Sequence, residues 1–194
     1  MNDLEDLLDR IRGDLAGVGS ALVGGIAVSV RAEPRFTRDV DLAVAVADDE
    51  EAEALVARLS ERGWRVTETL EHEVAGRLTA ARLQPQGETT EGRVVDLLFA
   101  SSGIENEIVA GAEELEVLPG IRALVASIGH LIVLKVLASA EDRPQDGADL
   151  VALLERADGE DLRIAREAGR LVVERGYNRD KDLVGEIERL VAPG

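Results

Sequence analysis

Residues 22–46, LVGGIAVSVRAEPRFTRDVDLAVAV, contain a Gly-Gly pair and, after thirteen further residues, an Asp-x-Asp pair. Leu22 and Val23 predict the end of a short buried strand. Gly24 and Gly25 allow the backbone to turn sharply because neither residue has a Cβ. A short helix is predicted to follow, and its free N-terminal N–H groups suit the binding of phosphate.

The Asp-x-Asp pair opens a second predicted strand, residues 39–46, which is rich in β-branched residues. Side chains at positions i and i+2 of a strand share a face, so Asp39 and Asp41 lie side by side with Cα atoms roughly 7 Å apart. Two carboxylates at this separation can both reach one hard cation. The stretch therefore predicts a phosphate-binding turn beside a cation site.

These motifs resemble the nucleotidyltransferase signature of the DNA polymerase beta superfamily. Gly24-Gly25 and Asp39-Val40-Asp41 have the spacing of that signature, and Val95-Asp96-Leu97 is similar to its third carboxylate on a later strand. The segments GGIAV, PRFTRDVDL and LIVLKVLASAEDRPQDGADLVALL are most similar to the branch that contains AbiEii-type toxins of toxin–antitoxin systems and related small nucleotidyltransferases. The resemblance covers roughly residues 18 to 155.

The resemblance implies transfer of a nucleoside monophosphate from an NTP to a hydroxyl. Asp39, Asp41 and Asp96 are then the catalytic and metal-binding residues and hold two Mg²⁺ ions. One ion activates the hydroxyl and the other neutralises charge on the triphosphate. Asp96 completes the site of the first ion and can accept the hydroxyl proton.

The resemblance also implies a set of nucleotide-binding residues. The amides of Gly24 and Gly25 hold the β- and γ-phosphates, and Lys135 reaches the triphosphate from a later helix. The remaining expected contributors are Arg35, Thr37 and Arg38, of which the arginines add positive charge. Asp146 and Asp149 match an RPxDxxDL-type segment of the family but receive no individual role.

Simpler interpretations stay open for several of these residues. Acidic-x-acidic pairs are common in a chain with 39 Asp and Glu residues, and Asp180-Lys181-Asp182 has the same pattern. Asp96 is alternatively a carboxylate at a strand edge, paired with an arginine. Lys135 either extends its ammonium group to the surface or faces the site. Arg35 and Arg38 are alternatively surface residues that offset local acid.

Together with the predicted helices and strands, the resemblance implies an α/β (α+β) fold of the nucleotidyltransferase type, with a mixed sheet flanked by helices. The predicted catalytic domain is 1–120, and a helical C-terminal region follows at 121–194, with the boundary at the Pro119-Gly120 turn. The predicted helices are 3–16, 26–31, 49–62, 104–112, 126–140, 144–155, 162–175 and 182–190. Further strands are predicted at 64–69, 78–83, 93–100 and 115–118.

Composition narrows the function further. The chain lacks cysteine, which excludes disulfides, thiolate metal sites and a cysteine nucleophile and is typical of a cytoplasmic protein. No apolar run approaches the roughly 18 residues of a membrane span. A formal net charge of −17 argues against tight non-specific binding to DNA.

Three functions are consistent with the sequence. The first is a toxin-like nucleotidyltransferase that acts on tRNA or protein and has an antitoxin as its partner. The second is a small-molecule, antibiotic-type nucleotidyltransferase. The third is a nucleotide-binding module that keeps the fold without catalysis, and the presence of all three carboxylates disfavours it.

Overall fold

The structure, a computed structural model, describes residues 3–37, 39–71, 77–87, 93–139 and 144–191. In these residues one mixed seven-stranded sheet has the order β3-β4-β5-β2-β1-β7-β6. The strands are β1 (Ser20–Val23), β2 (Val40–Val44), β3 (Trp64–Glu71), β4 (Leu78–Pro85), β5 (Val95–Leu98), β6 (Glu113–Leu118) and β7 (Ile121–Val125). The helices are α1 (Asp3–Asp14), α2 (Gly24–Arg31), α3 (Asp49–Glu61), α4 (Glu105–Ala110), α5 (Ile128–Ala138), α6 (Pro144–Arg156), α7 (Gly159–Glu174) and α8 (Leu183–Leu190).

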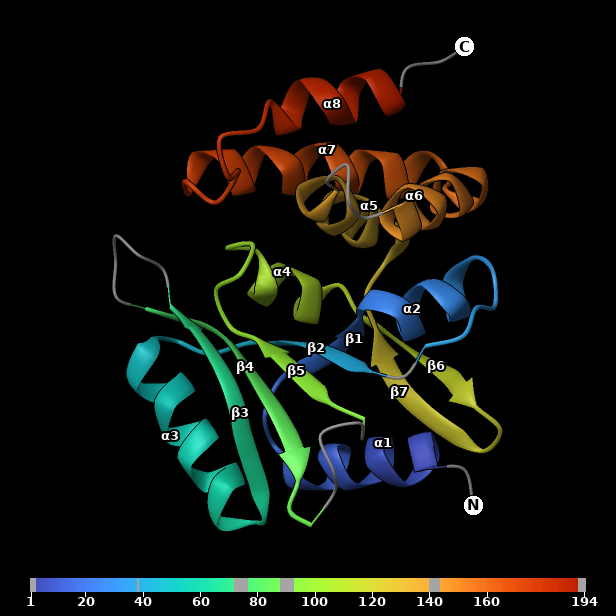
Figure 1. Cartoon of the computed structure of the whole chain (residues 1–194). Helices are drawn as coiled ribbons and strands as arrows, with labels where there is room; N and C mark the ends of the chain where they lie inside the picture. The colour runs from blue at the N-terminus through green and yellow to red at the C-terminus, as the bar shows by residue number, and fades with distance from the viewer. Residues whose placement is uncertain (1–2, 38, 72–76, 88–92, 140–143, 192–194) are drawn as a thin grey trace.

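The elements are stacked in layers around the sheet (Figure 1). In this view α1 lies below the sheet and α3 lies at its left beside β3, while α2 and α4 lie above it, beneath the C-terminal helices α5 to α8. This arrangement confirms the predicted mixed sheet flanked by helices with a helical C-terminal region. No helix in the described part of the chain is long and apolar enough to cross a membrane.

Helix α1 packs on the sheet through an apolar stripe of leucine and isoleucine side chains that recur at helical spacing and are buried. Polar side chains of α1 contact Trp64, the first residue of β3. The Arg10 guanidinium lies 4.7 Å from the centroid of the Trp64 ring, and the Trp64 indole donates to Asp14 at 2.8 Å. Asp48 caps α3 by accepting from the Glu51 amide, and Gly63 ends it with a φ of +85°.

Strand β7 was not predicted from the sequence. It pairs antiparallel with β6 across the turn that contains Gly120, and parallel with β1. The apolar alternation of this five-residue strand is broken because Leu124 faces solvent. The division of the chain at residue 120 stays a prediction, and the sheet's last strand lies on its C-terminal side.

The centre of the sheet sets the relative positions of the predicted site residues. β2 runs antiparallel to β1 and parallel to β5, with Val23 opposite Asp41 and Asp41 opposite Asp96. Their neighbours in the strands, including Val40 and Leu97, are buried in the core. The core side chains therefore fix the register, and the register places the two aspartates next to each other.

Candidate active site

A row of charged side chains crosses four neighbouring strands of the sheet. Glu68 on β3 lies opposite Arg82 on β4, Arg82 lies opposite Asp96 on β5, and Asp96 lies opposite Asp41 on β2. Cross-strand partners project to the same face of a sheet. We call these four residues the charged row. Its order of charges, acid–base–acid–acid, brings two carboxylates together at one end.

Asp41 is the most perturbed carboxyl group of the row. Burial, the neighbouring Asp96 and, to a smaller extent, Asp39 raise the pKa of Asp41 from 3.8 to about 6, against lowering effects from the Gly25 amide and Lys135. A carboxylate that is buried beside other carboxylates is destabilised in its charged form. Positive charge at this point would relieve that destabilisation.

Asp96 forms a bidentate ion pair with Arg82. The Arg82 Nε donates to Asp96 Oδ1 and its Nη2 to Oδ2, both at 2.8 Å, and these bonds raise the pKa of Arg82 above its usual value. This is the alternative that the sequence left open, a strand carboxylate paired with an arginine. Among the described residues, no group of three or more His, Cys, Asp or Glu side chains is arranged to hold a metal ion.

Other side chains lie so close to Gly24 and Gly25 that neither position has room for a Cβ atom. Gly24 has a φ of +59°, and a Cβ placed there would lie 2.0 Å from Asp41 Oδ2. A Cβ on Gly25 would lie 2.7 Å from Thr37 Oγ1 and 2.9 Å from Arg35 Nη2. The Gly25 amide, which was expected to hold phosphate, hydrogen bonds the Asp41 carboxylate here. The glycines thus let the start of α2 contact the carboxylate directly.

This contact gives a stability prediction with a matched control. Gly17 has a φ of +84°, and a Cβ at that position would have no neighbour within 4 Å, so Gly17→Ala introduces backbone strain alone, about 1–2 kcal/mol. Gly24→Ala adds the overlap with Asp41, and we expect a total loss of about 3 kcal/mol or more in the free energy of unfolding. Urea denaturation of both variants measures the difference. Equal losses would show that Asp41 does not approach Gly24.

A second group of charges joins the loop before β2 to the C-terminal helices. The Lys135 ammonium lies 2.7 Å from both Asp146 Oδ1 and Asp149 Oδ2. The Arg35 Nη2 also donates to Asp149 Oδ2, at 3.0 Å, and Gln145 donates to Asp149 Oδ1 at 3.0 Å. Burial alone would raise the pKa of Asp149, but the hydrogen bonds from Lys135 and Gln145 hold it below its usual value.

Asp39 and Thr37 are the other two predicted site residues that the structure describes. Asp39 precedes β2, and its charge raises the pKa of both Asp41 and Arg82, which places it near each of them. Thr37 lies over Gly25 together with Arg35. Arg38 lies outside the described residues. Arg82 was not predicted from the sequence, although the predicted strand at 78–83 contains this one charged residue among its apolar neighbours.

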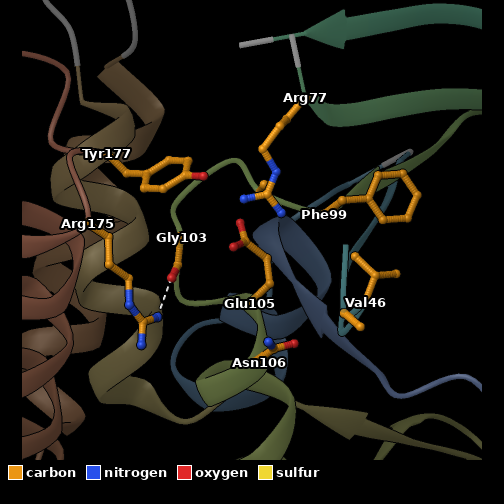
Figure 2. Close-up of a pocket in the computed structure, with 10 residues that line it drawn as sticks. Val46, Arg77, Phe99, Gly103, Glu105, Asn106, Arg175 and Tyr177 are labelled. Atoms are coloured by element: carbon orange, nitrogen blue, oxygen red, sulfur yellow. Dashed lines mark hydrogen bonds between the residues drawn. The ribbon is translucent and has the colours of Figure 1, made fainter. Parts of the chain in front are cut away.

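A pocket of about 370 Å³ lies at the other end of the same strands (Figure 2). Its walls come from the residues after β2 and β5, from the start of α4 and from the segment after α7. Figure 2 shows Arg77, Glu105 and Tyr177 projecting into it, while Arg175 donates to the Gly103 carbonyl. None of the predicted site residues that the structure describes lines this pocket. It is therefore separate from the charged row.

Comparison with solved structures shows that two other proteins share this fold. The antibiotic-resistance factor ANT(2″)-Ia matches with a TM-score of 0.59 and 19% identity, over 90% of this chain and 96% of the other. An antigenic nucleotidyltransferase-like protein from Paracoccidioides brasiliensis matches with a TM-score of 0.53 and 16% identity, over 96% and 92%. A search of curated proteins found no match.

The family model described as "Nucleotidyl transferase AbiEii toxin, Type IV TA system" matches residues 6–191. This match includes Gly24 and Gly25 at the start of α2, the charged row and the group of charges around Lys135. The resemblance noted in the sequence is confirmed over nearly the whole length. The chain therefore belongs to the AbiEii nucleotidyltransferase toxin family and is a nucleotidyltransferase.

Proposed function

We propose that the protein transfers a nucleoside monophosphate from an NTP to a hydroxyl acceptor at the Asp41 end of the charged row, with Mg²⁺ as the cofactor. The observation that carries this proposal is the strand register, which sets Asp41 directly beside Asp96 and against the start of α2. The raised pKa of Asp41, caused first by burial and then by Asp96 and Asp39, agrees with it. Three carboxylates that repel one another suit a divalent cation, and nucleotidyltransferases of this kind generally use a divalent metal.

Asp39, Asp41 and Asp96 would hold the cation, and two ions are consistent with three carboxylates. When bound, the metal would lower the pKa of the acceptor hydroxyl and neutralise charge on the triphosphate. Gly24, at the start of α2, contributes an N-terminal backbone N–H group that suits phosphate. Arginine and lysine side chains near this helix end would attract the same anion.

Lys135 and Arg35 are the cationic side chains that we assign to the triphosphate, with Thr37 beside them. Lys135 acts electrostatically on Asp41 although it belongs to α5, so the C-terminal helices reach the site. Both cations contact Asp149, which keeps their charged groups next to each other. In this proposal Asp146 and Asp149 orient the two cations and do not contact the reacting atoms.

For the acceptor we propose a hydroxyl on tRNA or protein, and for regulation an antitoxin protein. Membership of the AbiEii family supports this acceptor and this partner, because the family is described as a toxin of a type IV toxin–antitoxin system. With a net charge of −17, the protein would contact an RNA acceptor only near its reacting end.

The test is an incubation of the full chain with each α-labelled NTP and Mg²⁺, supplied in turn with total tRNA, a protein extract or small metabolites. We expect label in tRNA or protein. Label confined to metabolites would identify a small-molecule nucleotidyltransferase. No label in any pool would support a nucleotide-binding module and contradict the proposed activity.

A further inference from the structure

Arg82 uses both oxygens of a carboxylate that the proposed reaction needs. Its two hydrogen bonds to Asp96 are parallel and equal in length, at 2.8 Å. Paired N–H donors from one guanidinium make a strong and directional ion pair. The Asp96 side chain is only 17% exposed, so solvent weakens this pair less than it would a fully exposed one. A cation cannot take both Asp96 oxygens while Arg82 keeps them.

Arg82 has a second acidic partner on its other side. Its Nη1 lies 3.6 Å from Glu68 Oε2, and the Glu68 side chain is 54% exposed. Glu68 and Asp96 lie opposite Arg82 on the strands that flank it, β3 and β5. A change in the Arg82 side-chain torsions would therefore exchange one carboxylate for the other without moving the backbone.

We propose that Arg82 is a positioning residue that competes with the divalent cation for Asp96, and that Glu68 accepts Arg82 when the cation binds. The proposal rests on the proposed function, because it assigns the cation to Asp96 together with Asp41. It explains why three carboxylates lie near one another while none of the described residues form a ready metal-binding group. Arg82 sets the fraction of protein in which Asp96 is free, and so sets the apparent cation affinity.

Binding of Mn²⁺ alone to the full chain, measured by electron paramagnetic resonance without nucleotide, tests this competition. Arg82→Met removes the competitor, and we expect the Mn²⁺ affinity to rise about tenfold. Glu68→Gln removes the alternative partner of Arg82, and the affinity should fall by about threefold. Arg122→Met is the matched control, because Arg122 is an exposed strand arginine paired with Glu114 on the neighbouring strand. It changes the net charge equally and should leave Mn²⁺ affinity unchanged.

The double variant separates competition from a general effect of charge. With Arg82 absent, Glu68 has nothing to accept, so Glu68→Gln in the Arg82→Met background should not change the Mn²⁺ affinity further. An equal fall in both backgrounds would mean that Glu68 attracts the cation at a distance, and it would overturn the proposal. Unchanged or weaker binding in Arg82→Met would overturn it as well.

Asp41→Asn distinguishes this inference from the proposed function. If Asp41→Asn binds Mn²⁺ as well as the parent, the proposed metal site is wrong. If Asp41→Asn loses Mn²⁺ binding while Arg82→Met equals the parent, the site stands and the competition is wrong. Thermal denaturation checks that each variant folds, and the exposed, conservative Glu68→Gln keeps the proposal testable if Arg82→Met does not fold.

Discussion

Asp41→Asn is expected to make the metal-free protein more stable at pH 7 and to remove its transferase activity. The pKa of Asp41 is raised from 3.8 to about 6, so its ionised form is disfavoured in the folded state. A shift of this size corresponds to about 2–3 kcal/mol at neutral pH. Asparagine has nearly the same shape, keeps an oxygen for the Gly25 amide and carries no charge, so the substitution should recover most of this free energy.

The effect should depend on pH in a defined direction. The folded state holds the Asp41 proton more tightly than the unfolded state, so between about pH 4 and pH 6 the folded state carries more protons. The parent protein therefore loses stability as the pH rises through this interval, and the full penalty is present above it. We expect the advantage of Asp41→Asn to be largest near pH 7 and to shrink towards pH 4. Urea denaturation in EDTA across this range measures it.

Asp182→Asn is the control, because Asp182 belongs to the same kind of Asp-x-Asp pattern. Its side chain is exposed and caps α8 by accepting from the Gly185 amide, a position where asparagine substitutes well. It should change neither stability nor activity. Asp41→Asn should also lose the thermal stabilisation by Mg²⁺ and NTP and reduce transfer by at least about 100-fold. A destabilised Asp41→Asn, or one that keeps the ligand-induced shift, would contradict the proposed site.

Local sequence patterns predicted most of the elements because the signals that define them are local. Asp48 caps α3, Gly63 ends it and Pro144 begins α6. Each of these signals acts on residues within one helical turn of itself. The Asp39–Asp41 pair was similarly visible in the alternation of strand β2. These features do not depend on which elements pack together.

The pairings within the site were not predictable from local patterns. Whether Asp96 faces Arg82 depends on the register of β4 against β5. The alternation within one strand indicates which side chains face the core, but which residue lies opposite on the next strand depends on the packing of both strands. The sequence left Asp96 open between a metal ligand and a partner of an arginine, and the structure shows the second arrangement. The contacts of Lys135 likewise depend on how α5 packs against α6.

Lys135→Met is expected to destabilise the protein by about 3 kcal/mol, because it leaves the partly buried Asp146 without its cation and Asp149 with Arg35 as its remaining cation. Lys135 is 9% exposed and Asp149 is 2% exposed, and Asp146 is the other carboxylate that Lys135 contacts. Methionine fills the space of the apolar part of the lysine side chain. The loss in the free energy of unfolding would therefore come from the missing charge and not from a cavity. Chemical denaturation without nucleotide measures it, and removal of the acid in Lys135→Met/Asp146→Asn should restore part of the loss.

Lys181→Met is the matched control, since these are the two lysines of the chain. The Lys181 ammonium donates to the carbonyls of Val136 and Ser139, so its removal leaves no unpaired charge and should cost only about 1–2 kcal/mol. If Lys135→Met keeps the parental stability and loses only NTP affinity, Lys135 serves the nucleotide alone. A loss of stability larger than that of Lys181→Met would instead show that the ion pairs of Lys135 with Asp146 and Asp149 hold α5 and α6 together before any nucleotide binds.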